Sequence, residues 1–210
     1  MAYVPITLDP KTPKLVKSFI RSHLEMQLHD VHAMLRLPMR RQDGKFEEGL
    51  EAGCNFPAAG WLLALVSGVS TLVYSTETSS KKRFLKLMTT HYPWEPGASA
   101  AQDAEDLYFL FRNPLAHALG LPTDDTKAGV KRSAPSGSLG VMKTGLPEDL
   151  IEQFERSPAR PSIAQSTIQR NAEGGRSLSV EGLYWGVRVM IQKLTADPTA
   201  MASAEKFLRT

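Results

Sequence analysis

Residues 56–74 read FPAAGWLLALVSGVSTLVY, and no charged residue occurs from Ala52 to Thr76. Large side chains recur along this segment at spacings of three and four, the pattern of one helix face; they are Leu62, Leu65, Val66, Val69, Leu72 and Val73. The opposite face carries small side chains, namely Ala64, Gly68, Thr71 and Ser75. We therefore predict a buried helix over 57–75 at the centre of a helical bundle.

A membrane-spanning helix is the alternative for the same segment, because about 20 apolar residues are enough to cross a bilayer. Pro57, two glycines and several hydroxyl side chains dilute its hydrophobicity, and no basic cluster flanks it closely. We favour the buried helix and expect no contact with a membrane. The small face allows another backbone to approach closely, either inside the bundle or at a contact between two copies.

Five further helices are predicted outward from this segment, so the fold class is mainly α, a helical bundle in a single domain over 1–210. Their approximate ranges are 13–37, 79–91, 98–119, 178–195 and 199–208. Thr12 or Asp9 is the expected cap of the first helix, and Ser177 or Ser179 that of the long helix near the C-terminus. Residues 39–55 are expected to form a loop with a little helix.

Residues 123–176 differ from the rest of the chain and are predicted to be an insertion into the bundle. Five glycines or prolines fall within 123–146, which favours turns and short strands. We expect short strands near 140–144 and within 162–169, and a short helix that begins at Pro147. The role of this insertion does not follow from the sequence.

Charge and cysteine content narrow the classes of function. The formal net charge is +3, and no long run of lysine and arginine exists that could follow a DNA backbone, so no DNA partner is predicted. The single Cys54 excludes an internal disulfide and a zinc site built on cysteines, and it fits a reducing, cytoplasmic location. The N-terminus carries no basic-then-apolar signal pattern.

In residues 106–120, DLYFLFRNPLAHALG, the apolar run that follows Asp106 contains Arg112, Asn113 and His117. On an unbroken helix, Arg112 and His117 would lie about 140° apart. Pro114 lacks the N–H that would bond to Leu110 and crowds its carbonyl, so the helix is expected to kink or restart there. Asn113 would be the N-cap of the new helix, and Arg112 could then turn toward His117.

The pattern Arg112-Asn113-x-x-x-His117 resembles the motif of HEPN domains, the higher-eukaryote and prokaryote nucleotide-binding domains. That motif is an arginine, four to six intervening residues and a histidine, often with a polar residue after the arginine. The resemblance covers the motif and the helical frame, about residues 10–121 and the helix at 178–195. Pro114 inside the motif is unusual for the family, and 123–176 has no counterpart that we can place.

The resemblance implies a metal-independent endoribonuclease that acts as a homodimer on RNA and needs no cofactor. Histidine can act as acid or base near neutral pH, and arginine can hold two phosphate oxygens at once. Arg112, Asn113 and His117 would be the catalytic residues, and stress, toxin or anti-phage responses are the settings that the family suggests. The RNA target, the cleavage preference and any antitoxin partner cannot be read from the sequence.

Other interpretations of the motif stay open. His117 fits a hydrogen-bonded core histidine, and Arg112 fits an ion pair with Asp103, Glu105 or Asp106. The protein would then be a non-catalytic HEPN-like interaction or ligand-binding protein, or an unrelated helical bundle.

Residues outside the motif are candidates for binding a metal ion, RNA phosphate or a stacked base. His29 and His32, with Glu25, have the spacing of metal ligands on one helix face, but no third ligand at suitable spacing is present and a solvated polar face is favoured, so no metal is predicted. Lys81, Lys82 and Arg83 are the candidates for contact with RNA phosphate, against a solvated helix face as the simpler reading. Trp185 is expected in the core, with base stacking as the alternative.

Overall fold

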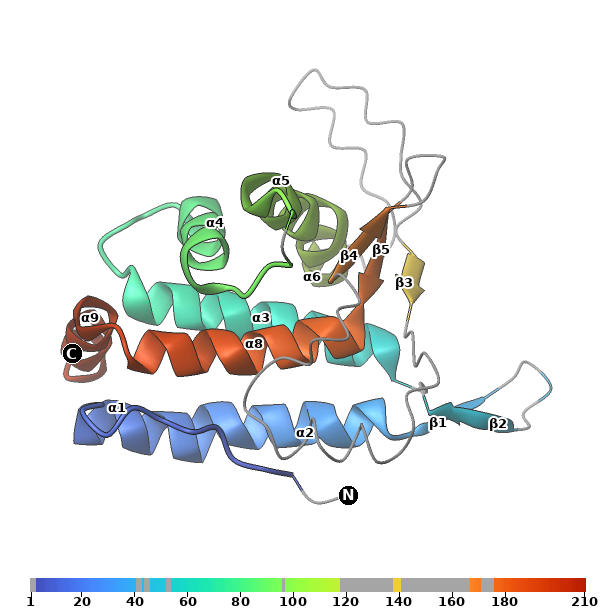
Figure 1. Ribbon diagram of the computed structural model, residues 1–210, viewed down its shortest axis with the longest axis horizontal. Coiled ribbons are helices and arrows are strands. Elements are labelled where there is room, and N and C mark those ends of the chain that lie inside the picture. Colours follow the sequence, from blue (N-terminus) through green and yellow to red (C-terminus); the bar gives the residue numbers. More distant parts are fainter. Residues whose placement is uncertain are drawn as a thin grey trace.

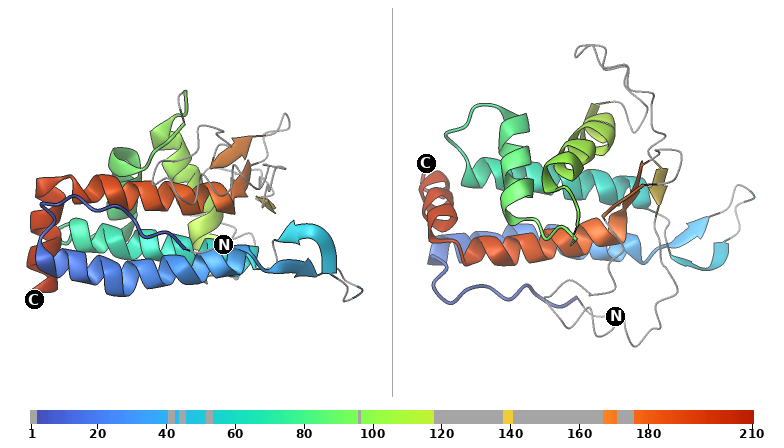
Figure 2. Two further views of the ribbon diagram at one scale, coloured as in Figure 1. Left: turned by 60° about the horizontal axis from the view of Figure 1, so that its bottom comes forward. Right: turned by 45° about the horizontal axis from the view of Figure 1, so that its top comes forward.

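The computed structural model describes residues 3–40, 43, 46–51, 54–95, 97–117, 138–140, 167–170 and 176–210. Within these residues the protein is a mainly α helical bundle, as predicted. The long helical elements, called rods here, run side by side, and shorter helical segments pack across them (Figures 1 and 2). The predicted short helix from Pro147, residues 118–119 of the motif helix and most of 123–176 lie outside the described residues.

The first rod is the N-terminal helix, predicted over 13–37. It consists of α1 (Lys14–Phe19), a π-helical segment η1 (Ile20–Leu24) and α2 (Glu25–Leu35), with helical backbone at both junctions. The predicted cap was wrong, because Pro13 occupies the N-cap position without a side-chain hydrogen bond. The side chain of Thr12 bonds instead to the carbonyl of Asp9, which closes the turn before the helix.

The second rod is α3 (Asn55–Val73), the helix predicted over 57–75. All six large side chains of its predicted bulky face are buried, and α3 contacts α2, α4, α8 and α9. Among the described residues it is the one helix long and apolar enough to cross a membrane, and 56% of that apolar window is buried inside the protein. Burial of this kind is what the central helix of a bundle shows.

The third rod is α8 (Val180–Thr195), and α9 (Pro198–Leu208) packs at one end of the bundle (Figure 1). The hydroxyl of Ser179 accepts a hydrogen bond from the N–H of Gly182 at 3.0 Å, which confirms one of the two predicted caps. Asp197 caps α9 through the N–H groups of Thr199 and Ala200, with Pro198 at the first helical position.

Two shorter helical segments cross the rods. Helix α4 (Ser80–His91) begins at Ser79, whose hydroxyl accepts a hydrogen bond from the N–H of Lys82. The motif helix, the name used here for residues 100–117, consists of α5 (Ala100–Asp106), a π-helical segment η2 (Leu107–Arg112) and α6 (Asn113–His117). Both elements were predicted to within two residues at their described ends.

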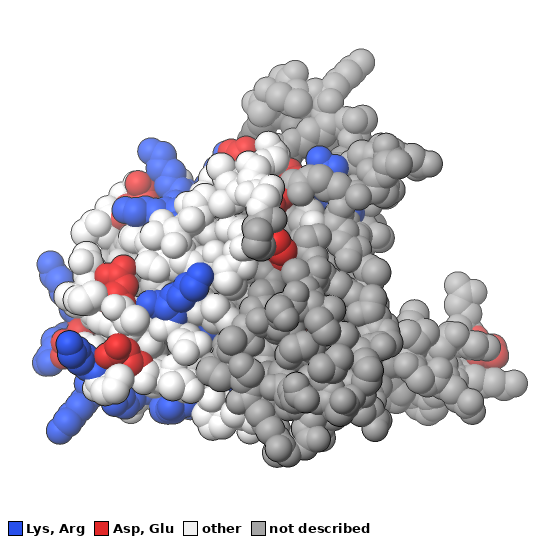
Figure 3. Space-filling view, in the orientation of Figure 1, with Lys and Arg blue, Asp and Glu red and all other residues white. Residues whose placement is uncertain are grey.

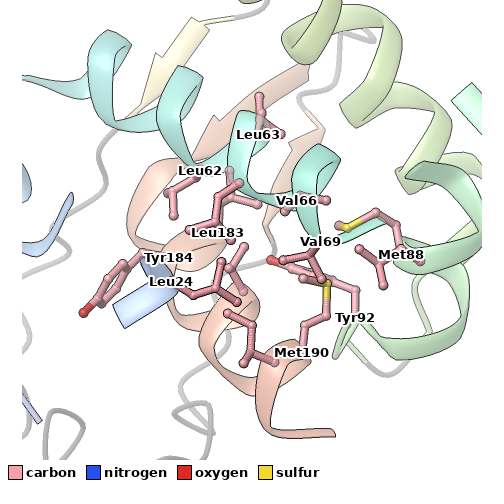
Figure 4. Close-up of a cluster of buried hydrophobic side chains, with 14 of the residues drawn as sticks. Leu24, Leu62, Leu63, Val66, Val69, Met88, Tyr92, Leu183, Tyr184 and Met190 are labelled. Carbon is pink, nitrogen blue, oxygen red and sulfur yellow. The ribbon is translucent and has the colours of Figure 1, made fainter. Parts of the chain in front are cut away.

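The core extends between the rods and α9, and part of it lies where α3, α4 and α8 meet. Figure 4 shows side chains of all three helices packed around Leu62, Val66 and Leu183, with Met88 and Tyr92 at the side of α4. Each of these residues has at most 4% of its surface exposed. A close-packed interior of this kind supplies most of the free energy that holds a helical bundle together.

Strands form at two places. β1 (Pro38–Arg40) and β2 (Phe46–Glu51) pair antiparallel, with Pro38 opposite Glu51, in a hairpin that projects past the end of α2 (Figure 1). The prediction of a loop with a little helix over 39–55 was therefore wrong. The sequence pair Asp43-Gly44 is typical of hairpin turns and could have predicted this hairpin.

The second set of strands is a small sheet in the order β3 (Ser138–Gly140), β5 (Arg176–Ser179), β4 (Ile168–Arg170). β5 is parallel to β3 and antiparallel to β4. Of the strand expected near 140–144, the structure describes only residue 140, which ends β3. Of the strand expected within 162–169, it describes only 167–169, where β4 begins. β5 was not predicted, and it leads directly into α8.

Candidate active site on the motif helix

The backbone of the motif helix continues through the motif without a break. Asn113 has helical dihedral angles (φ −66°, ψ −50°), and its N–H bonds to the carbonyl of Tyr108, five residues earlier. The expected restart with Asn113 as N-cap was therefore wrong, since an N-cap residue has non-helical backbone. The π-helical segment η2 widens the helix just before Pro114, at the place where the proline ring would crowd a regular α-helix.

This π-helical segment ends at Arg112, the first residue of the motif. Short π-helical insertions are rare and are frequent at functional sites. Pro114 indicated an irregular helix at this place, but the sequence did not distinguish a widened turn from a kink or a restart.

Arg112 is half-buried and contacts its own helix. Its guanidinium donates a hydrogen bond to Oδ1 of Asn113 at 3.0 Å, and its central carbon lies 5.3 Å from the centre of the Tyr108 ring. The contact with Asn113 orients the amide, and the face of Tyr108 supports the cation. Two of the three predicted catalytic residues are thus brought into direct contact.

His117 is the last residue of α6, and its side chain lies outside the described residues. Positions 113 and 117 are four apart on an α-helix and lie on the same face. The approach of Arg112 to His117 therefore stays a prediction.

One carboxylate considered as the partner of Arg112 is engaged by a residue from elsewhere in the chain. Oδ2 of Asp106 lies 3.0 Å from Nε of Arg176 on β5, and Oδ1 accepts a hydrogen bond from Gln102 at 2.8 Å. Asp103 is buried at 3% exposure, and Glu105 is exposed. Arg176 could not be identified from the sequence, because no local pattern relates it to a helix 70 residues away.

The three candidate RNA-binding residues of α4 have different environments. The ammonium of Lys81 lies 4.2 Å from the centre of the Phe109 ring, which brings this charge beside the motif helix. Lys82 is exposed, whereas the guanidinium of Arg83 donates to the backbone carbonyl of Glu77. On the face of the molecule that Figure 3 shows, basic and acidic side chains are interspersed over the described residues and do not form one basic stripe.

The remaining candidates are placed as follows. His29 is exposed, in agreement with a solvated face, but His32 is buried at 6% exposure; both pack against the ring of Tyr3. Glu25 is occupied by Arg21 and by the N–H of Ile6. Within the described ranges, no group of three side chains could hold a metal ion.

Trp185 is in the core, as expected, at 6% exposure. Its indole N–H donates to Glu181 at 3.0 Å. Base stacking on this ring would require its release from the bundle.

Comparisons of the chain with models of protein families, with curated proteins and with solved structures gave no match.

Proposed function

We propose that this protein is a metal-independent endoribonuclease of the HEPN type, with Arg112, Asn113 and His117 as its catalytic residues. The observation that carries the proposal is the arrangement at the end of η2. There Arg112 contacts Asn113 directly, and His117 follows one α-helical turn later on the same helix. The resemblance of this motif to that of HEPN domains supplies the reaction.

The reaction is an attack of a ribose 2′-oxygen on the adjacent phosphorus. The bond between phosphorus and the 2′-oxygen forms, and the bond to the 5′-oxygen of the next nucleotide breaks. One imidazole accepts the 2′-hydroxyl proton, and a second imidazole donates a proton to the leaving 5′-oxygen. The guanidinium of Arg112 stabilises the charge on the phosphorane oxygens, and its contact with Asn113 sets the plane in which it does so.

Cleavage of RNA in EDTA tests the proposal. We expect His117→Ala and Arg112→Ala each to lower the rate by about 100-fold, the usual effect of losing one proton-transfer group or one charge-stabilising donor. Arg112→Lys should recover only part of the loss, because an ammonium keeps the charge without the two-pronged geometry. The measurement is the cleavage rate of a mixed-sequence oligoribonucleotide, with circular dichroism to establish folding.

The matched control is Arg209→Ala, which removes a guanidinium from the exposed end of α9 and should leave cleavage unchanged. An oligonucleotide with 2′-deoxyribose at every position should resist cleavage. If the folded parent cleaves no RNA of a varied panel, the non-catalytic HEPN-like alternative is favoured. Cleavage that persists in both motif variants removes these residues from the mechanism.

The proposal includes a homodimer in the cytoplasm, since two copies of the motif across a two-fold axis supply both the acid and the base. The small face of α3 supports this arrangement. Ala64 and Gly68 are exposed, and Trp61 and Phe56 beside them are 46% and 55% exposed. A Cβ added at Gly68 would meet no atom within 4 Å, so packing inside the chain does not require this glycine.

A charge on the small face should therefore dissociate the dimer. We expect the parent to sediment at twice the mass of the chain and Ala64→Arg to sediment as a monomer, because an unpaired charge at a desolvated contact costs several kcal/mol, about 2–5. The measurement is sedimentation velocity at micromolar concentration. Ala33→Arg, at an exposed position of α2, is the matched control and should stay dimeric; a monomeric parent would contradict the arrangement.

A further inference from the structure

An ion pair joins β5 to the motif helix. Nε of Arg176, at the start of β5, lies 3.0 Å from Oδ2 of Asp106, the last residue of α5. The two side chains are 23% and 12% exposed, so the pair is less screened by water than a surface pair.

Asp106 is placed where the helix changes geometry. It precedes Leu107, the first residue of the π-helical segment that ends at Arg112. Both of its carboxylate oxygens are engaged, Oδ1 by Gln102 within the helix and Oδ2 by Arg176 from the sheet. The junction of α5 and η2 is therefore bound to β5, at the helical turn that sets the position of Arg112.

The strand that carries Arg176 is itself firmly anchored. Leu178 and Ser179 on β5 are 0% and 2% exposed, and the N–H of Ser179 bonds to the carbonyl of Thr167 at 2.9 Å. The hydroxyl of Thr167 in turn contacts the phenol of Tyr92 at 2.8 Å, at the end of α4. Figure 1 shows β4 and β5 between α6 and the start of α8. Arg176 thus links the motif helix to a fixed part of the bundle.

We propose that Arg176 is a positioning residue for the motif helix. Through Asp106, it holds the π-helical segment in the register that presents Arg112 to the phosphodiester. The expected effect on cleavage rests on the proposed function. The proposal also gives a role to Arg176, the last residue of the predicted insertion. Loss of the ion pair does not remove the guanidinium of Arg112, but it shifts the position of this group relative to the substrate.

The test is a double-mutant cycle of Arg176→Gln and Asp106→Asn with two readouts. We expect hydrogen exchange of the amides of 107–117 to accelerate severalfold in each variant, while exchange in α3 and α8 stays unchanged. We also expect kcat to fall about tenfold with KM nearly constant, within the 10²-fold that a small misplacement of a catalytic group can cost. The loss in the double variant should be smaller than the sum of the two single losses, because the pair of Arg176 and Asp106 is absent in all three variants.

Arg209→Gln is the matched control, because it breaks an ion pair with Glu205 that is 67% and 30% exposed and far from the motif. It should change neither readout. Unchanged exchange in 107–117 of the Arg176→Gln protein, or acceleration throughout the chain, overturns the proposal. A parent protein that cleaves no RNA contradicts the proposed function instead, and the exchange measurement still decides whether Arg176 orders the motif helix.

Discussion

Gly186→Ala is expected to destabilise the protein by about 3 kcal/mol, because overpacking of a close-packed core costs roughly 1–3 kcal/mol or more. Gly186 lies on α8 beneath the ring of Tyr92. A Cβ at this position would come within 2.0 Å of the phenol oxygen, 2.2 Å of Cζ and 2.5 Å of Cε2. Real Cβ atoms do not approach other atoms so closely, so the ring must leave its site.

Tyr92 cannot move without further loss. It is 4% exposed, its hydroxyl contacts the Thr167 hydroxyl at 2.8 Å, and its ring packs on Trp94 with centres 4.6 Å apart. Displacement of the ring would break the link between α4, α8 and β4 at once. The gain of about 1 kcal/mol that alanine gives over glycine within a helix offsets only part of this cost.

The measurement is chemical denaturation, with Gly60→Ala as the matched control. Gly60 and Gly186 both lie within helices, but a Cβ at Gly60 would meet nothing within 4 Å. We expect the control to be neutral or stabilising by up to about 1 kcal/mol. In a Tyr92→Ala background the clash is gone, so adding Gly186→Ala should cost nothing further. A loss of 3 kcal/mol that persists there would show that Tyr92 is not the cause.

Arg188→Ala is expected to cost about 4 kcal/mol, since truncation of a large buried side chain leaves a cavity and unpaired partners. Arg188 is 3% exposed on α8. Its guanidinium donates to the phenol oxygen of Tyr184 at 3.3 Å and to the backbone carbonyl of Val4. The contact with Val4 fastens the N-terminal segment across the bundle.

Aromatic rings surround the buried charge. The guanidinium carbon lies 4.9 Å from the centre of the Tyr3 ring, 5.3 Å from that of Trp185 and 5.6 Å from that of Tyr184. Burial raises the pKa of Tyr3 to about 12 and raises the pKa of Tyr184 as well, despite the nearby positive charge. Both phenols are therefore neutral at pH 7, and the cation is stabilised by ring faces and a carbonyl rather than by a phenolate.

A series of substitutions at Arg188 separates these contributions. Methionine fills most of the volume and should cost about 2 kcal/mol, mainly for the unpaired Tyr184 phenol and the lost cation–π contacts. Lysine keeps the charge but not the flat, forked geometry, and should lie between methionine and alanine. The measurement is the free energy of unfolding, with the exposed Arg209→Ala as control. Equal costs for methionine and alanine would contradict the assignment of half the loss to the cavity.

The helices of this protein could be predicted from local sequence. The spacing of Leu62, Val66 and Val69 gave the buried face of α3, and Ser179 gave the start of α8, because a helix is formed by residues three and four apart. The sequence also identified the candidate site as far as Arg112 and Asn113, which are neighbours in the chain and lie in contact.

What the sequence could not determine involves partners that are distant in the chain. β5 was missed because its parallel partner β3 and its antiparallel partner β4 belong to other segments, and strand pairing is not a local property. The widened turn before Pro114 was predicted as a kink or a restart of the helix, since propensity alone does not say which irregularity the surrounding core accepts. The link of Arg176 to Asp106 and the cage of rings around Arg188 likewise depend on packing between elements. Helix formation rests on near neighbours and was readable from the sequence, whereas the environment of each buried charge was set only when distant elements packed together.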